Sequence, residues 1–225
     1  MRQLLNSRNS VLTFLLISHT ILAKSSGCMT QFEQLDLLFE QNHGIVKTAQ
    51  VLEHGIPKHT LYAYAKKNNI EKAAHGIYIS QDAWSDAMYI LHLRCAQGVF
   101  SHESALYFHD LTDREPSEYS ITVKTGYNPA SLKADGVKVY TIKKELHDVG
   151  VITMNTTFGH TVPVYDAERT ICDIIRSRSG IETQTFHDAL KQYAARRDKD
   201  LRRLIRYVQM FHVEKILRQY MEVLL

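Results

Sequence analysis

Residues 58–67 concentrate side chains that can contact nucleic acid, and no acidic residue interrupts them. Lysine ammonium groups pair with phosphate oxygens, whereas hydroxyl and imidazole groups can reach the edges of bases. We expect the lysines to position the protein, and His59, Thr60 and Tyr62 to read bases from a major groove. The competing interpretation is a solvated basic helix packed in a small bundle. The candidate residues in this segment are Lys58, His59, Thr60, Tyr62, Lys66 and Lys67.

Two short helices joined by a tight turn are expected to present this segment. Apolar residues recur near the helical period over residues 45–53, which predicts the first helix. Gly55 ends it, because glycine accepts the left-handed backbone of a helix C-terminus. Pro57 suits the first position of a second helix, which we place over 58–67. This is a helix-turn-helix, with an expected apolar side formed by Ile45, Ala49, Leu52, Leu61, Tyr64 and Ala65.

A two-stranded wing is predicted over residues 70–80. The Asn68-Asn69 pair breaks the second helix, and the strands turn at His75-Gly76. We expect Lys72, His75 and Gly76 to belong to the interface, with Lys72 and His75 meeting phosphates. A helix over 31–41, opened by a capping box of Thr30 and Glu33, completes a three-helix core. We therefore place a winged helix-turn-helix domain at 29–82.

This stretch resembles the N-terminal domain of the AbiEi family of type IV antitoxins. The family's motif has a small residue six positions before the turn glycine, then Gly-Ile, a helix and an apolar-x-basic-x-x-basic-Gly-apolar-Tyr wing. In this sequence the motif falls on Ala49, Gly55, Ile56, Ile70, Lys72, His75, Gly76, Ile77 and Tyr78. Two positions depart from it: His75 replaces a usual arginine, and Asn69 a usual glycine. Since histidine is mostly neutral at pH 7, we expect weaker phosphate contact there.

The resemblance extends more diffusely to the C-terminus, through Ser101–Leu106 (SHESAL) and Glu168–Asp173 (ERTICD). It implies a transcriptional repressor that binds double-stranded DNA at inverted repeats in its own operator. It also implies an antitoxin of an abortive infection system, countering a nucleotidyltransferase toxin without a stable complex. No enzyme activity and no cofactor are implied.

Residues 83–225 predict a mixed α+β domain with a small sheet and C-terminal helices, so the fold class of the chain is α+β. Strands are expected at 119–124, 137–142, 151–155 and 161–165. Helices are expected at 84–97, 101–109, 166–176, 182–195, 199–209 and 213–225. Trp84, Met88, Leu91 and Cys95 would share the buried face of the first.

A second basic cluster occupies residues 191–206, where seven lysines and arginines face two aspartates. It is either a solvated surface or a second phosphate-contacting patch that widens the DNA footprint. Besides Lys191, the basic residues are Arg196, Arg197, Lys199, Arg202, Arg203 and Arg206.

Composition limits other functions. The net charge of +3 permits nucleic-acid binding without arguing for it. Cys28, Cys95 and Cys172 form no C-x-x-C pair, so neither a disulfide framework nor a zinc site is expected. We expect the protein to reside in a reducing cytoplasm. The histidines form no H-E-x-x-H motif, and we expect no bound metal.

Residues 1–28 imitate a signal peptide, with arginines before a short apolar run. The run is short for a membrane span. We expect a spurious or disordered extension, with Met29 as the true start, rather than an anchor.

Two alternatives remain for residues 83–225. One is a nuclease resembling the Vsr fold, with Thr122-Val123-Lys124 on a strand and Asp135 or Glu145 replacing the missing metal ligand. The other is a ligand-sensing regulator without a toxin. The charged group of Asp166, Glu168, Arg169 and Asp173 could serve acid–base chemistry, but a helix cap and an i,i+4 ion pair explain it better.

Overall fold

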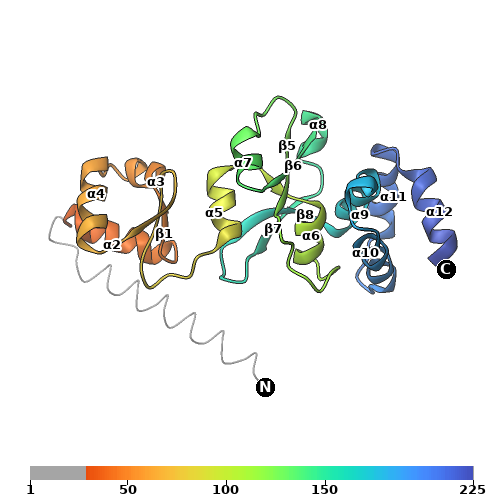
Figure 1. Ribbon diagram of the computed structural model, residues 1–225, viewed down its shortest axis with the longest axis horizontal. Coiled ribbons are helices and arrows are strands. Elements are labelled where there is room, and N and C mark those ends of the chain that lie inside the picture. Colours follow the sequence, from red (N-terminus) through yellow and green to blue (C-terminus); the bar gives the residue numbers. More distant parts are fainter. Residues whose placement is uncertain (1–28, 225) are drawn as a thin grey trace, which may run out of the picture.

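The computed structural model describes residues 29–224, and the expectation for residues 1–28 lies outside that range. The chain is mixed α+β with two sheets, which confirms the predicted fold class. Figure 1 shows an N-terminal lobe at one end, a sheet with its helices in the middle and a helical group at the other end. Among the helices of residues 29–224, none combines the length and apolar character that crossing a bilayer requires.

The N-terminal lobe is a winged helix-turn-helix. Its helices are α2 (Gln31–Gln41), α3 (Thr48–Glu53) and α4 (Lys58–Lys67). Its strands β1 (Ile45–Lys47), β2 (Glu71–Ala74) and β3 (Ile77–Ile79) form an antiparallel sheet in the order β1-β3-β2. The predicted capping box opens α2, because the Thr30 hydroxyl accepts from the Glu33 N–H while the Glu33 carboxylate accepts from the Thr30 N–H.

The predicted helix over 45–53 is wrong in its first three residues, which form β1. Gly44, with φ of +80°, turns the chain out of α2, and Ile45 and Val46 are both fully buried on opposite faces of a strand. The helix starts only at Thr48. Because α3 begins at Thr48, a different side of the helix is buried. Val51 lies in the core, and Leu52, which we expected there, is 44% exposed.

A five-stranded sheet forms the middle of the molecule in the order β6-β5-β4-β8-β7. The short strand β4 (Val99–Phe100) lies at its centre, antiparallel to β5 (Ser120–Lys124) and parallel to β8 (Thr161–Tyr165). The outer strands are β6 (Lys138–Ile142) and β7 (Val151–Asn155). The predicted pairing of 151–155 with 161–165 is confirmed, whereas β4 was not expected to be a strand.

Four helices accompany this sheet: α5 (Ala87–Arg94), α6 (His102–Phe108), α7 (Ala130–Ala134) and α8 (Lys144–His147). The helix expected from Trp84 begins at Ala87 instead, and Trp84 is 78% exposed rather than buried. Asp86 sets the start, because its carboxylate accepts from the Tyr89 N–H as an N-cap. Cys95 and Cys172 are free and buried.

The C-terminal helices are α9 (Ala167–Arg176), α10 (Thr183–Ala195), α11 (Leu201–Met210) and α12 (Glu214–Leu224), with a short 3₁₀ turn η1 (Arg178–Gly180). Helix α9 is the centre of this group, since residues 167–175 are all buried. It packs against both α6 and α11 and so joins the sheet to the C-terminal helices.

The winged helix-turn-helix is docked on the middle region through its own sheet. Ile45, Ile77 and Ile79 form a buried apolar cluster with Leu93 of α5. The Lys47 ammonium group also donates to the Leu93 carbonyl at 2.7 Å. One apolar cluster therefore spans the boundary that we placed at residue 82.

Candidate nucleic-acid interface

Helix α4 has one apolar side that packs in the lobe and one polar side that faces solvent. Leu61, Tyr64 and Ala65 are buried as predicted. Gly55, with φ of +74°, provides the predicted left-handed turn, and Pro57 occupies the cap position just before the helix. The exposed candidates on α4 are Lys58, His59, Tyr62, Lys66 and Lys67.

The position of Thr60 contradicts its predicted role in base contact. Its side chain is only 7% exposed, and its hydroxyl donates to the Gln31 side-chain oxygen at 2.8 Å. It therefore ties α4 to the start of α2 and does not lie on the solvent face. Residues 59 and 60 are adjacent, but consecutive positions on a helix point about 100° apart.

Helix α2 fixes the orientation of α4 through aromatic contacts. The Tyr64 ring stacks on Phe39 with centroids 5.7 Å apart and meets the edge of Phe32 at 5.3 Å. The Tyr64 hydroxyl donates to the Asp36 carboxylate. Burial and this carboxylate raise the pKa of Tyr64 above its ordinary value, so the phenol remains protonated as the donor.

The lysines of α4 are not equivalent. The Lys67 ammonium group lies 5.4 Å from the centre of the Phe32 ring, so it interacts with α2 as a cation over an aromatic face. Lys58 and Lys66 are exposed at opposite ends of the helix. We therefore regard Lys66, rather than Lys67, as the stronger candidate for phosphate contact at the C-terminal end of α4.

The wing is held in place at its turn. Gly76 has φ of +71°, and its carbonyl accepts from both the backbone N–H and the hydroxyl of Thr48, at 2.8 and 3.1 Å. This links the wing tip to the N-terminus of α3. Lys72 and His75 are exposed, as an interface requires, and Gly76 is half-buried.

Tyr62 connects the α4 surface with the wing. Its side chain is 53% exposed, and its ring lies 6.5 Å from that of Tyr78 on β3. Tyr78 is the register partner of Lys72 on β2. Tyr62 thus connects the exposed side of α4 with the wing at Lys72, whereas His75 lines a hollow shared with Leu93 and Arg94 of α5.

Fewer residues of the second basic cluster are exposed in the structure than the sequence suggested. Arg196 pairs with Asp198 and donates to the His109 carbonyl, and Lys199 donates to two backbone carbonyls. Arg203 lies 3.5–3.7 Å from the carboxylates of Asp200, Asp166 and Glu168. These three cations stabilise the fold. The exposed members of the cluster are Lys191, Arg197, Arg202 and Arg206.

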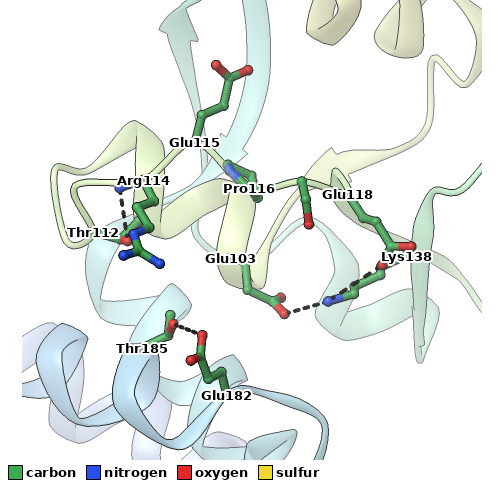
Figure 2. A pocket seen from close by; sticks show the side chains of 10 residues that line it. Glu103, Thr112, Arg114, Glu115, Pro116, Glu118, Lys138, Glu182 and Thr185 are labelled. Atoms are coloured by element: carbon green, nitrogen blue, oxygen red, sulfur yellow. Dashed lines mark hydrogen bonds and ion pairs between the residues drawn. The ribbon is translucent and has the colours of Figure 1, made fainter.

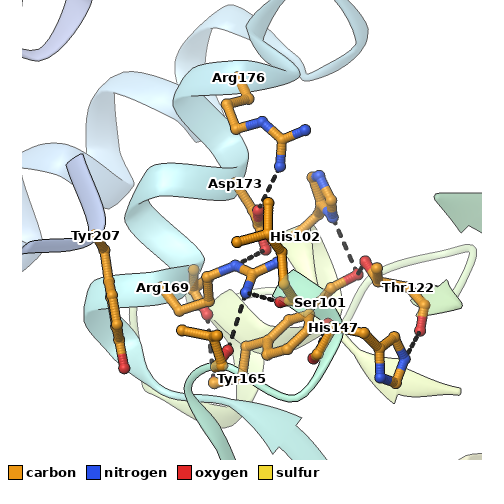
Figure 3. A network of polar contacts seen from close by, with 12 residues as sticks. Ser101, His102, Thr122, His147, Tyr165, Arg169, Asp173, Arg176 and Tyr207 are labelled. Carbon is orange, nitrogen blue, oxygen red and sulfur yellow. Dashed lines mark hydrogen bonds and ion pairs between the residues drawn. The ribbon is translucent and has the colours of Figure 1, made fainter. Parts of the chain in front are cut away.

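The charged group at the start of α9 is structural. It forms the helix cap and the i,i+4 ion pair that we preferred to acid–base chemistry. Asp166 caps the helix, accepting from the Arg169 N–H at 2.8 Å, and Arg169 pairs with Asp173 at 2.9 Å. Arg169 is fully buried beside Tyr165 (Figure 3). Its guanidinium lies 4.1 Å from the ring centre of Tyr165 and 4.1 Å from that of Phe211. It also donates to the carbonyls of Leu146 and Val149. Burial raises the pKa of Asp166 and of Asp173.

A second part of this network was not predicted. His102 stacks on Tyr140 at 3.5 Å, and its ring nitrogens lie 3.0 Å from the hydroxyls of Ser101 and Ser177. Burial, with the nearby cation Arg176, lowers the pKa of His102 to about 3. The ring is therefore neutral and serves as a hydrogen-bonded packing element between α6, β6 and the end of α9. Only the SHES sequence at residues 101–104 pointed to it.

A polar pocket of about 330 Å³ lies between α6, the 112–118 loop and the start of α10 (Figure 2). Lys138 lies at one side of it, with its ammonium group 3.1 Å from the carboxylate of Glu103 and 3.8 Å from that of Glu118. Glu182 accepts from the Thr185 hydroxyl on the opposite wall. The lining as a whole carries four carboxylates against two cations, Arg114 and Lys138, so its net charge is negative. The pocket is where the ligand-sensing hypothesis would be tested.

The structure does not bring together the residues that the nuclease hypothesis requires. Asp135 pairs with Arg94, Glu145 is exposed on α8, and Lys124 pairs with Asp148 at 3.1 Å. Within residues 29–224, no three or more His, Cys, Asp or Glu side chains are grouped so that they could hold a metal ion. An acid–x–lysine metal site is thus not assembled from the residues proposed for it.

The fold and this surface define a winged helix-turn-helix joined to an α+β region. Residues 33–81 match the family described as "Transcriptional regulator, AbiEi antitoxin". The match confirms the predicted resemblance over the N-terminal lobe. It covers the N-terminal lobe alone and supports a role in transcriptional regulation.

Most of the chain also resembles a solved structure. The crystal structure of the RV2827C protein from Mycobacterium tuberculosis superposes with a TM-score of 0.55, covering 81% of this chain and 72% of that one. The sequences are 15% identical, so the likeness concerns the fold alone. No curated protein matches the sequence.

Proposed function

We propose that this protein is a sequence-specific DNA-binding repressor of its own operon, which docks α4 in the major groove and the wing on the adjacent backbone. The observation that carries the proposal is the exposed side of α4, which Tyr62 connects with the wing at Lys72. This side presents Lys58, His59, Tyr62 and Lys66, the wing adds Lys72 and His75, and all six are exposed. The family match over the same residues supports this assignment.

Base reading is assigned to His59 and Tyr62, because Thr60 faces α2. Both side chains lie on the solvent side near the middle and N-terminal part of α4. An imidazole and a phenol can each donate to or accept from a base edge. The lysines would set position and orientation without reading sequence.

The experiment is binding to DNA from upstream of the protein's own gene, compared with unrelated DNA of the same length. We expect His59→Ala or Tyr62→Ala to reduce the preference for the operator by about 1–3 kcal/mol per lost base contact. Thr60→Val is the matched control, since it should lower stability without changing that preference. Equal affinity of the wild-type protein for both DNAs would contradict the proposal.

We also propose that the chain counters a nucleotidyltransferase toxin without forming a stable complex with it, in a type IV abortive infection system. The antitoxin description of the matching family supports this part. A toxin gene next to this one, and rescue of growth when the two are co-expressed, are the expected results. Failure to rescue would contradict the antitoxin role, and a co-purifying complex would contradict the proposed mode of action.

The exposed residues of the second basic cluster are proposed as an auxiliary phosphate-contacting patch. Arg202 and Arg206 lie one turn apart on α11, and Arg197 precedes that helix. Replacing all three with alanine should weaken binding to operator and unrelated DNA alike and reduce the salt dependence. Unchanged binding would restrict the interface to the N-terminal lobe.

A further inference from the structure

The edge strand β7 of the middle sheet has the properties of a self-pairing surface. It is the last strand in the order β6-β5-β4-β8-β7, so within residues 29–224 one of its sides has no neighbouring strand. Its sequence VITMN carries no charge, and Val151 and Ile152 are each 36% exposed. Edge strands commonly carry lysine or proline, which discourage pairing with other chains. At the opposite edge, β6 begins with Lys138.

The backbone bonds of the hairpin show which residues of β7 point toward the open side. Asp166 N–H donates to the Gly150 carbonyl at 2.7 Å, and Thr156 N–H donates to the His160 carbonyl at 2.8 Å. Bonded and non-bonded pairs alternate along an antiparallel ladder, and the register from 151 to 155 is unbroken. Residues 152 and 154 therefore bond inward to β8. The N–H and C=O groups of Val151, Thr153 and Asn155 point outward.

We propose that β7 pairs antiparallel with β7 of a second copy of this chain, about a two-fold axis at Thr153. The outward groups are centred on Thr153, so they would make about six hydrogen bonds with the same groups of the other copy. This contact is isologous, because the same surface is used by both subunits. No like charges would face each other in it.

The side chains are also self-complementary. Ile152 and Met154 lie on the same face as their register partners Val164 and Val162, which belong to the apolar core of the middle region. In the proposed pair, Ile152 would face the partner's Met154. The apolar row of Val164 and Ile152 would then continue through the partner's Met154 to the partner's Val162, shielding the exposed Ile152.

The pairing involves five residues of each strand, which is a small contact compared with the roughly 1,200 Å² or more of stable interfaces. We therefore expect a weak, reversible dimer. Two-fold symmetry would suit an inverted repeat, but the pairing itself can be tested without DNA, independently of the proposed function.

The test uses the full chain with Cys28→Ser and one added cysteine. In a bonded antiparallel pair the Cα atoms lie about 5.5 Å apart, a separation that a disulfide can span. Thr153→Cys should therefore form a covalent dimer about tenfold faster than random collision allows. Thr161→Cys is the matched control, because Thr161 is an exposed threonine one strand further inward. Equal cross-linking of the two variants would overturn the proposal.

Sedimentation from micromolar to millimolar protein provides the second measurement. Wild type should dimerise at the upper end of this range, and Thr153→Lys should lose the dimer because it places two like charges directly opposite each other. Thr161→Lys should keep it. A monomer throughout for wild type, or an unchanged dimer in Thr153→Lys, would refute pairing through β7.

Discussion

Thr60 and Tyr62 are two residues apart on α4, yet their side chains lie in opposite environments. Thr60 is bonded to Gln31 in the lobe, whereas Tyr62 is 53% exposed beside the wing. Both are polar residues of the kind that read bases, so residue type alone did not separate them. The difference gives Thr60 a structural role and leaves His59 and Tyr62 as the residues that we propose read bases.

His102 leads to a prediction at the same scale. Its pKa is about 3 in the folded protein, compared with about 6.5 in an unfolded chain. Between these values only the unfolded state binds the proton, so the stability present above pH 6.5 is lost as the pH falls. We expect the free energy of unfolding to fall by about 2 kcal/mol more between pH 7 and 5 in wild type than in His102→Asn. Urea denaturation at the two pH values measures this.

Asparagine is chosen because residue 102 has φ of +49°, a conformation that asparagine accepts better than most residues. His59→Asn, at an exposed position on α4, is the control and should retain the wild-type pH dependence. Parallel pH curves for wild type and His102→Asn would show that the buried ring does not govern acid stability.

At the scale of elements, the packing of α4 against α2 gives the adjacent residues Lys66 and Lys67 different surroundings. Lys66→Ala should lower the slope of log affinity against log salt by about one unit, because one phosphate contact is lost. Lys67→Ala should change the slope less, since its ammonium group lies over Phe32. Titrations of operator DNA at several salt concentrations make the comparison. Equal slopes for the two variants would contradict the assignment.

The wing depends on one backbone conformation. Gly76→Ala should destabilise the protein by about 1 kcal/mol, because an L-residue is strained at φ of +71°, and it should weaken DNA binding by displacing the wing. Gly180→Ala is the matched control, at a glycine with open space around it and no such backbone requirement. Denaturation and DNA titration of both variants test this, and similar losses in both would argue against a special role for the wing turn.

For the whole molecule, the junction at α5 makes the N-terminal lobe dependent on the rest of the chain. A fragment of residues 29–82 would expose Ile45, Ile77 and Ile79, which pack on Leu93 in the intact chain. We expect it to bind a hydrophobic dye and to melt at a lower temperature than the full chain. Ile77→Thr with Ile79→Thr in the fragment should reduce dye binding. A fragment as stable and as dye-free as the full chain would show that the docking contributes little.

The sequence by itself determined the elements whose signals are local. The ends of α2 and α4, the left-handed turn at Gly55, the wing and the hairpin of β7 and β8 follow from capping residues, glycines and alternation between neighbouring positions. The helix cap at Asp166 and the ion pair of Arg169 with Asp173 lie within one or two turns, so they were predictable as well.

Only the tertiary structure decided the features that depend on distant partners. Residues 45–47 become a strand because β3, thirty or more residues away, supplies their hydrogen bonds. Thr60 turns inward because Gln31 lies beside it, and three basic residues of the 196–206 cluster are used by carboxylates and carbonyls of the fold. A helical period or a run of charge describes one segment, but burial and pairing energies depend on what another segment places against it.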